Sequence, residues 1–395
     1  MIQSFSIARL PRIEFGIGGI QKLPSLIAQY GNRVLLVTGG RSFSESPHWP
    51  VLLTALEKAG IGWAQVRITD EPSPQNVDEA VRQFHGQGFM AVVGIGGGSV
   101  LDAAKAIAGL LPIGASVMDY LEGVGPEKTY CGPALPFIAV PTTAGTGSEA
   151  TKNAVLSVRG PDGFKKSFRD DKLVPEYALL DPNLLASCPK PQIAANAMDA
   201  LTQLLESYVS IKANALTDAL AESGLKAVRD GLFAWYEDGT DAAVGRTRMA
   251  YAALLSGICL AQTGLGSVHG LASPLGAFFP IPHGVVCGTL VGAATRVNLT
   301  ALRERDPGNL AWRKYARAGD LLHGRHFPSP EEGHAALLAL LDAWTERLKL
   351  PRLNAYGIQE SDLTHVVAHS RGSSMKTNPL VLSDVEIAEV LQQRL

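Results

Sequence analysis

The sequence predicts an α/β domain followed by an all-α domain, the first built on a doubly wound parallel sheet. In the first half, short β-branched apolar runs alternate with amphipathic helical patterns, and right-handed crossovers between such runs give a mostly parallel sheet. From about residue 189 onward, long helical patterns follow one another without a convincing strand. The change of period falls near 184–192, so we expect domains at 1–188 and 189–395.

The elements of the first half are identified by their periodicity and their boundaries. "RVLLVTGG" is a buried run that ends in glycines, and the 76–88 pattern carries acidic residues in its first turn, where they suit the helix dipole. The strands are expected at 33–40, 62–68, 89–97 and 136–143, and the helices at 49–60, 76–88 and 99–111. In the second half, helices are expected at 193–211, 213–231, 242–263, 309–324, 331–348 and 384–394.

Length and composition restrict the class of protein. The chain has 395 residues, 46% of them hydrophobic and 18% charged, which is typical of a soluble globular protein with more than one core. The formal charge of −2 gives no electrostatic basis for binding nucleic acid or an anionic membrane. We see no secretory h-region and no apolar run of about 18 residues, so a cytoplasmic location is expected. The cysteines lack CxxC spacing and are expected to be reduced core thiols: Cys131, Cys188, Cys259 and Cys287.

A glycine turn follows the third expected strand, in "VVGIGGGSVLDAAK" at 92–105. Gly96, Gly97 and Gly98 let the backbone approach a phosphate closely, and the helix that begins near Ser99 offers free N–H groups. The turn therefore predicts pyrophosphate binding, with a plain strand–helix turn as the structural alternative. Asp102 is expected to brace this turn.

A second loop with related chemistry follows the fourth expected strand, in "PTTAGTGSEAT" at 141–151. Small hydroxyl-bearing residues and glycines make it suited to the phosphate and ribose of a cofactor, although alone it would be an ordinary polar loop. The residues expected to contact the cofactor are Thr142, Thr143, Thr146, Gly147 and Ser148.

Polar groups in otherwise apolar segments indicate a metal site. In "AANAMDALTQLLESYVS" (194–210), Asp199 and Gln203 are four residues apart and share one helix face. His269 and His283 are separated by three prolines, which prevent one straight helix, so the chain must turn before the two imidazoles can meet. Either histidine alone is more typical of a hydrogen-bonded core residue than of a metal ligand. Together with the carboxylate and the amide they form a candidate site for iron or zinc.

These motifs resemble the iron-containing (group III) alcohol dehydrogenase family, which is similar in fold to glycerol dehydrogenase and dehydroquinate synthase. The resemblance is carried by "GGGSVLDAAK", "PTTAGTGSE", "VPEYALLDPNLL", "MDALTQLLESYVS", "VHGLASPLGAFFPIPHG" and a late "NP" at 378–379. It implies a Rossmann-like nucleotide domain, a helical domain, a divalent metal in the cleft between them, and a homodimer. It also implies hydride transfer between NAD(P) and a small alcohol or aldehyde, with the metal acting as a Lewis acid.

The resemblance also assigns metal ligands and reveals two departures. Asp199, His269 and His283 match three of the four ligands of the family, whereas Gln203 stands where the family usually has a histidine. Ser273 replaces a second histidine that lies near the nicotinamide in the family and relays protons; a serine can only pass protons along a chain. Both departures keep two alternatives open. These are a metal-independent reductase of the maleylacetate type and a nucleotide-binding homologue that has lost catalysis.

Two further segments concern the cofactor. Many NAD-preferring relatives carry an aspartate after the first long strand, where this sequence has Gly39, Gly40, Arg41 and Ser42. The missing carboxylate and the added guanidinium favour tolerance of NADP, unless Arg41 only points to solvent. Lys165 aligns with a family lysine near the cofactor phosphates and the nicotinamide and is a candidate catalytic residue; Lys166 is an equally good local candidate.

Overall fold

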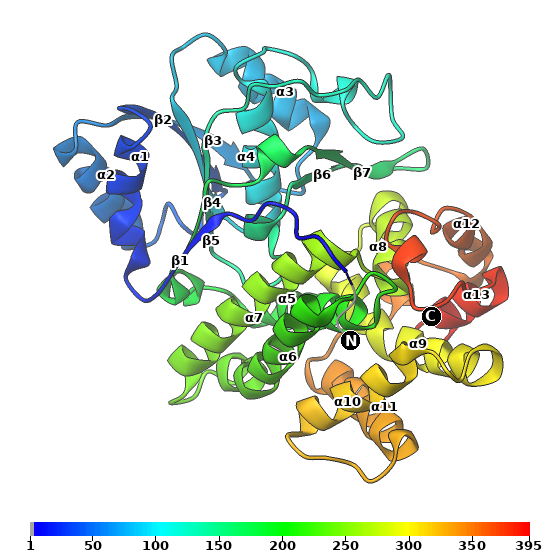
Figure 1. Cartoon of the computed structure of the whole chain (residues 1–395). Helices are drawn as coiled ribbons and strands as arrows, with labels where there is room; N and C mark the ends of the chain where they lie inside the picture. The colour runs from blue at the N-terminus through cyan, green and yellow to red at the C-terminus, as the bar shows by residue number, and fades with distance from the viewer. Residues whose placement is uncertain (1–3) are drawn as a thin grey trace. The chain divides into compact units, whose positions relative to one another are not determined.

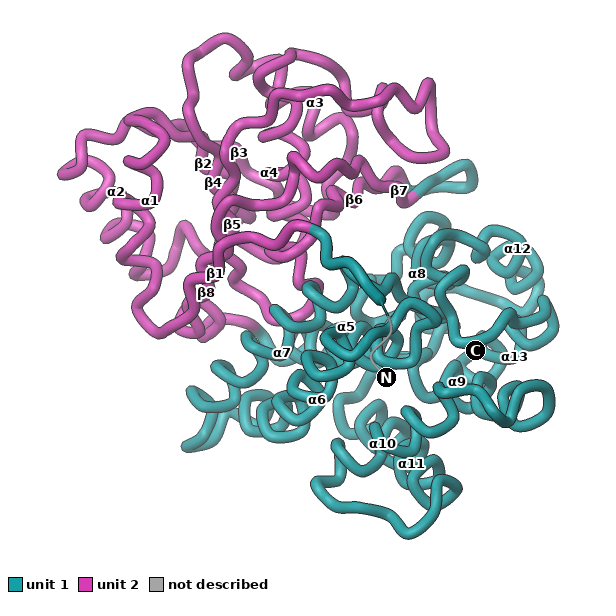
Figure 2. The backbone as a smooth tube through the Cα atoms, viewed as in Figure 1, with its two compact units in different colours: residues 1–8, 159–164, 189–395 teal, residues 9–158, 165–188 magenta. Residues whose placement is uncertain are grey.

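The structure is a computed structural model that describes residues 4–395, and the chain forms two compact units (Figure 2). The α/β unit comprises residues 9–158 and 165–188, and the helical unit comprises residues 4–8, 159–164 and 189–395. A single cut after residue 188 assigns 4–8 and 159–164 to the first domain, whereas both segments group with the helices.

The α/β unit contains a six-stranded sheet in the order β1-β8-β5-β4-β2-β3, and every neighbouring pair is parallel. This confirms the predicted parallel sheet. A separate two-stranded sheet pairs β6 with β7. The strands are β1 Arg12–Phe15, β2 Arg33–Gly39, β3 Gly62–Ile68, β4 Ala91–Gly96, β5 Phe137–Pro141, β6 Asn153–Val158, β7 Phe164–Arg169 and β8 Tyr177–Leu180.

Helices cover both faces of the six-stranded sheet. Helices α1 (Leu23–Ala28) and α2 (His48–Lys58) lie on one face, and α3 (Pro74–Phe84) and α4 (Gly98–Leu110) lie on the other (Figure 1). Residues on both faces of β4 are buried, so the central strands are continuous apolar runs, as expected for a parallel sheet. Because β5, β4 and β2 are neighbours in this parallel sheet, their carboxyl ends lie side by side.

Residues 189–395 form nine α-helices, and no residue of this range lies in a strand. All six predicted helical patterns form helices, and α8, α9 and α12 are added to them. The helices are α5 Lys190–Val209, α6 Ala215–Tyr236, α7 Ala242–Thr263, α8 Ser267–Phe278, α9 His283–Arg305, α10 Leu310–His323, α11 Pro330–Arg347, α12 Leu363–Ala368 and α13 Asp384–Gln392.

Helix α9 approaches α5 closely because glycines face it. A Cβ atom on Gly284 would lie 2.5 Å from the carbonyl oxygen of Ala195, and one on Gly288 would lie 2.8 Å from Cβ of Met198. Any larger residue would therefore push the two helices apart. Among the described residues α9 is the one helix long and apolar enough to span a membrane by itself, but 89% of its most apolar window is buried, as in a core helix.

Candidate active site

Four side chains of the helical unit converge on one point. Asp199 comes from α5, His269 from α8, and His283 and Cys287 from α9. One oxygen, nitrogen or sulfur atom of each lies within 4.8 Å of those of the other three. Asp199 Oδ1 is 3.2 Å from Nε2 of His269 and 3.7 Å from Nε2 of His283. Cys287 Sγ is 3.5 Å and 3.8 Å from the same two nitrogens.

Local structure explains how distant residues meet. Helix α8 ends at Phe278, and α9 begins at His283 directly after Pro282, so the chain turns between the two histidines as the prolines predicted. His283 and Cys287 are four residues apart on α9 and therefore share one face. The expectation that Cys287 would be a simple core thiol missed this placement, because it depends on a helix that the sequence did not reveal.

Glu206 on α5 holds His269 in place. Its Oε2 lies 2.7 Å from Nδ1 of His269, and its Oε1 accepts a hydrogen bond of 2.7 Å from the backbone N–H of Val268. Gly266 leaves room for this carboxylate, since a Cβ atom there would lie 2.9 Å from Oε1. A carboxylate on Nδ1 fixes the tautomer and aims Nε2 at the cluster. The sequence signal for this role is the spacing on α5, where Glu206 lies two helical turns after Asp199.

Asn378, in the late "NP" motif, also holds the start of α8. Oδ1 of Asn378 accepts a hydrogen bond of 3.1 Å from the backbone N–H of Ser267. Its amide nitrogen donates to Oδ1 of Asn298 on α9 at 2.8 Å. Asn378 thus ties the segment that carries His269 to the helix that carries His283.

The electrostatics of the cluster favour a cation. Burial opposes ionisation of Asp199, but His283 and His269 outweigh it and lower the pKa of this carboxyl. Burial acts to lower the pKa of His269, yet its contacts with Cys287, Asp199 and Glu206 raise that pKa well above its usual value. Burial raises the pKa of Cys287 to about 12. Among the described residues, Oδ2 of Asp199 is buried without a hydrogen-bond partner, so a bound cation would satisfy it.

The side-chain oxygen of Gln203 does not face the cluster, and Ser273 is not buried. The amide nitrogen of Gln203 donates to Oδ1 of Asp199 at 3.1 Å, and its carbonyl oxygen accepts from Oγ of Ser256 at 2.9 Å. Its oxygen, the atom that a metal would need, is therefore directed at Ser256. Ser273 lies on α8 one turn after His269 and is exposed. The ligand role of Gln203 and the catalytic role of Ser273 stay predictions.

In the α/β unit, the two predicted cofactor segments lie together at the carboxyl ends of β4 and β5. The backbone N–H of Thr142 donates to the carbonyl of Gly96 at 2.9 Å. A Cβ atom on Gly97 would lie 3.2 Å from Oγ1 of Thr143, and one on Gly98 would lie 2.7 Å from Thr146. Gly97 also caps α4 without a side chain, which leaves the helix N-terminus open to an anion.

A buried amine links α4 to the loop after β5. Nζ of Lys105 is fully buried and donates to the carbonyl oxygen of Ser148 at 2.9 Å, to Oγ1 of Thr151 at 3.0 Å and to the carbonyl oxygen of Asn153 at 2.6 Å. Asp102 accepts a hydrogen bond from Oγ of Ser148. Burial lowers the pKa of Lys105. These contacts fix both cofactor segments relative to each other.

The remaining predicted cofactor residues lie at and just after the end of β2, and on β7. Gly39 ends β2, and Gly40, Arg41 and Ser42 follow it. The side chain of Arg41 is 86% exposed and lies 3.9 Å from Glu45. Lys165, on β7, forms an ion pair of 3.1 Å with Glu71, and only 12% of its side chain is exposed.

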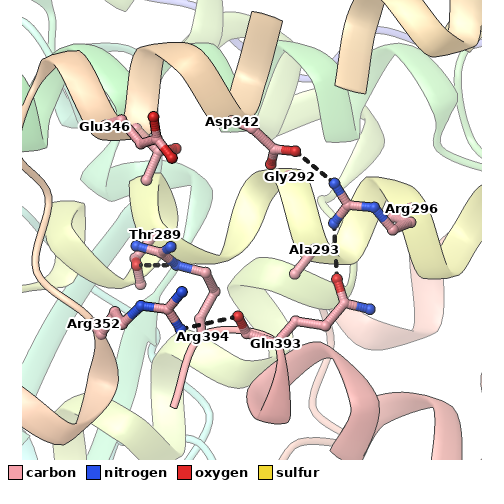
Figure 3. A pocket seen from close by; sticks show the side chains of 10 residues that line it. Thr289, Gly292, Ala293, Arg296, Asp342, Glu346, Arg352, Gln393 and Arg394 are labelled. Atoms are coloured by element: carbon pink, nitrogen blue, oxygen red, sulfur yellow. Dashed lines mark hydrogen bonds and ion pairs between the residues drawn. The ribbon is translucent and has the colours of Figure 1, made fainter. Parts of the chain in front are cut away.

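A polar cavity of about 240 Å³ lies on another face of α9 (Figure 3). Thr289 and Arg296 of α9 line it together with Asp342 of α11 and Arg394. Arg296 pairs with Asp342 at 2.6 Å, and Nε of Arg394 donates to Oγ1 of Thr289 at 2.9 Å. Because Thr289 is two residues beyond Cys287, the cavity and the cluster occupy different sides of the helix.

Comparison with known families decides the identity. The profile for iron-containing alcohol dehydrogenase matches residues 11–182, and that for the C-terminal region of the Fe-containing alcohol dehydrogenase family matches residues 193–395. The chain belongs to the iron-containing alcohol dehydrogenase family. This confirms the resemblance found in the sequence. The chain is an oxidoreductase of this family, which supports the metal-assisted interpretation over both alternatives, and with it the predicted NAD(P) and divalent metal.

Individual relatives cover almost the whole chain. Alcohol dehydrogenase 4 of Saccharomyces cerevisiae is 32% identical over 86% of this chain and 85% of its own length. The 1-propanol dehydrogenase PduQ of Salmonella typhimurium is 32% identical over 94% of this chain and 95% of its own length. The solved structure of a 1,3-propanediol oxidoreductase matches all of both chains at 28% identity with a TM-score of 0.89. These similarities confirm the predicted fold class.

Proposed function

We propose that this iron-containing alcohol dehydrogenase family member transfers hydride between NAD(P) and a small primary alcohol or its aldehyde, with a divalent metal at the helical-unit cluster. The observation that carries the proposal is the meeting of Asp199, His269 and His283: both Nε2 atoms face Oδ1 of the buried carboxylate, and its other oxygen, Oδ2, lacks a hydrogen-bond partner. The relatives named for propanol and propanediol oxidation support a small alcohol as substrate.

The residues of the cluster have distinct tasks in this proposal. Asp199, His269 and His283 would hold the ion, which when bound supplies Lewis-acid polarisation of the substrate oxygen. With the ion bound, Glu206 would keep the proton of His269 on Nδ1, so that Nε2 would present its lone pair to the ion. Gln203 donates to Oδ1 of Asp199 and thereby orients that carboxylate.

The α/β unit would hold the nicotinamide cofactor. Gly96, Gly97 and Gly98 allow the pyrophosphate to approach the N-terminus of α4, where the helix dipole and free N–H groups favour an anion. The loop at 142–148 would contact phosphate and ribose. Lys105 and Asp102 keep the loop and the turn in one arrangement.

We also propose that the protein is a cytoplasmic homodimer. All four cysteines are free, as in proteins kept in a reducing compartment. Strand β1 lies at the edge of the sheet, and it and the residues after it expose Ile13 and Ile17. An open edge with apolar side chains is a site for pairing with a second copy. Ile13→Lys should shift the mass measured by light scattering from dimer toward monomer, and an unchanged dimer would exclude this edge.

The test of the proposed reaction combines elemental analysis with an activity screen. Purified protein is loaded with a divalent ion without oxygen and assayed for reduction of C2–C4 aldehydes with NADH and with NADPH. We expect turnover that is lost on chelation and in Asp199→Asn. Asp320→Asn should keep it, because this carboxylate on α10 contacts His326 and Phe327 and not the cluster. Loaded protein that binds an ion but oxidises no alcohol and reduces no aldehyde would contradict the proposal.

A further inference from the structure

We propose that Cys287 is the fourth metal ligand of this chain, that it replaces the imidazole missing at Gln203, and that the resulting centre prefers zinc over iron. The inference rests on the proposed metal-assisted function and concerns which side chain completes the donor set. The matching position of the family's histidine is filled by an amide whose oxygen is bonded to Ser256, so the fourth donor must come from elsewhere.

The distances fit a tetrahedral ion. With metal–nitrogen bonds of about 2.0–2.1 Å and a metal–sulfur bond of about 2.3 Å, a tetrahedron separates sulfur from nitrogen by about 3.6 Å and nitrogen from oxygen by about 3.3 Å. Sγ of Cys287 lies 3.5 Å and 3.8 Å from Nε2 of His269 and His283. Oδ1 of Asp199 lies 3.2 Å and 3.7 Å from the same atoms. These four of the six separations among the donor atoms are within about 0.4 Å of the tetrahedral values.

The thiol is directed at the cluster by the backbone. Cys287 follows His283 by one turn on α9 and is completely buried. The neighbouring Gly288 brings α9 against Met198 of α5, next to Asp199. Cys259, the other fully buried cysteine, instead points Sγ at the backbone carbonyl of Thr217 at 3.6 Å. An ordinary core thiol does what Cys259 does, whereas Sγ of Cys287 faces two imidazole nitrogens.

The donor set determines the metal preference. One thiolate sulfur, two imidazole nitrogens and one carboxylate oxygen form a borderline-soft tetrahedral set, which suits zinc. An all-imidazole and carboxylate set is harder and accommodates iron more readily. The loss of the histidine at Gln203 and the use of Cys287 therefore act together, and both shift the metal preference toward zinc.

The experiment reads ligation directly and does not depend on turnover. Wild-type protein is stripped with a chelator and reloaded with Co(II), and its absorption spectrum is recorded. A cysteine ligand gives a thiolate-to-cobalt charge-transfer band in the near ultraviolet. We expect this band in the wild type and in the matched control Cys259→Ser, and we expect it to disappear in Cys287→Ser and Cys287→Ala.

A competition assay tests the preference. Stripped protein is offered equal Zn(II) and Fe(II) without oxygen, and bound metal is measured by elemental analysis. We expect zinc to predominate by at least tenfold in the wild type. The double variant Gln203→His/Cys287→Ala should shift toward iron by a similar factor and lack the band.

The outcomes separate this inference from the proposed function. Cobalt that binds the wild type without a charge-transfer band, or a band that survives in Cys287→Ala, would overturn the role of Cys287 while aldehyde reduction by metal-loaded protein continued. Preferential retention of iron by the wild type would overturn the zinc preference. If no divalent ion binds and no aldehyde is reduced, the proposed function fails as well.

Discussion

Nδ1 of His269 lies 2.7 Å from Oε2 of Glu206, while Oε1 of the same carboxylate accepts from the N–H of Val268. Because a carboxylate only accepts, Nδ1 of this histidine carries a proton that it donates to Glu206, and Nε2 faces Asp199 and Cys287. One buried glutamate thus orients a ligand and satisfies the N-terminus of the helix that carries it.

Replacing this glutamate should weaken metal binding more than it weakens the fold. Glu206→Gln can offer an oxygen to only one of its two partners, Val268 and His269, so the imidazole of His269 is no longer held in one orientation. We expect the affinity for Zn(II), measured by competition with a chromophoric chelator, to fall roughly 10- to 100-fold. Asn378→Ala is the control, since it loosens the start of α8 without a contact to His269. Equal losses in both variants would mean that Glu206 acts only on the helix.

The glycine turn should be essential for cofactor affinity. Gly97→Val places a branched side chain against Thr143, where a Cβ atom alone already lies 3.2 Å from Oγ1, and where phosphate oxygens must approach. We expect a loss of at least about 2 kcal/mol in NAD(P) binding by calorimetry, the magnitude of one charge-assisted contact. Gly16→Ala, at a position with nothing within 4 Å, is the control. Unchanged affinity at a normal melting temperature would remove the turn from the site.

The end of β2 should set the choice between NADH and NADPH. Without a carboxylate there, the wild type should use NADPH at least as well as NADH. Gly39→Asp fits sterically, because a Cβ atom would make an ordinary contact of 3.8 Å with Val100, and it should shift the kcat/KM ratio toward NADH by like-charge repulsion. Arg41→Ala should shift it in the same direction. Identical ratios in wild type and both variants would show that this segment does not face the 2′ position.

Much of the fold could be predicted from periodicity, and the failures have physical causes. The buried strands β2, β4 and β5 are continuous apolar runs bounded by glycine or proline, so they stand out. Strands β1 and β8 have four residues each, too few to show a period. Helix α9 contains Gly284 and Gly288, which disfavour an isolated helix. Its stability comes from close packing against α5, which is a tertiary effect.

The candidate site was predictable only as far as spacing and family resemblance reached. Asp199, His269 and His283 could be named from the sequence, and the structure brings them together. Cys287 could not, because a lone cysteine in an apolar stretch usually lies in a core, and its relation to His283 exists only if 283–287 is helical. Gln203 could be recognised as an exchange, but the direction of its amide depends on Ser256, which is distant in sequence.

The packing of α9 on α5 should control the geometry of the cluster. A Cβ atom on Gly288 would lie 2.5 Å from Cδ1 of Leu350 and 2.8 Å from Cβ of Met198, so Gly288→Ala must displace α9. We expect a cost of about 1–3 kcal/mol in unfolding free energy, together with weaker Zn(II) binding because Cys287 and His283 move with the helix. Gly224→Ala, between α5 and α6 with a contact of 2.5 Å to Leu204, should destabilise similarly without the metal effect. Loss of metal affinity in both variants would indicate general loosening of α5.

Stability of the α/β unit should depend on pH through Glu149. Burial raises the pKa of this glutamate from 4.5 to about 7, and Lys105 only partly opposes the effect. Because the folded-state pKa is the higher one, the contribution to stability is complete below about pH 4.5 and is lost as the pH rises through 7. The difference between the two pKa values corresponds to about 3 kcal/mol.

Glu149→Gln keeps the shape of the side chain and removes the titration. We therefore expect the unfolding free energy of the wild type, measured in denaturant, to fall more steeply than that of the variant between about pH 5 and 8. Asp102 is retained in both proteins, so its own titration cancels in the comparison. Parallel pH profiles for wild type and Glu149→Gln would show that this carboxyl ionises without cost in the folded state.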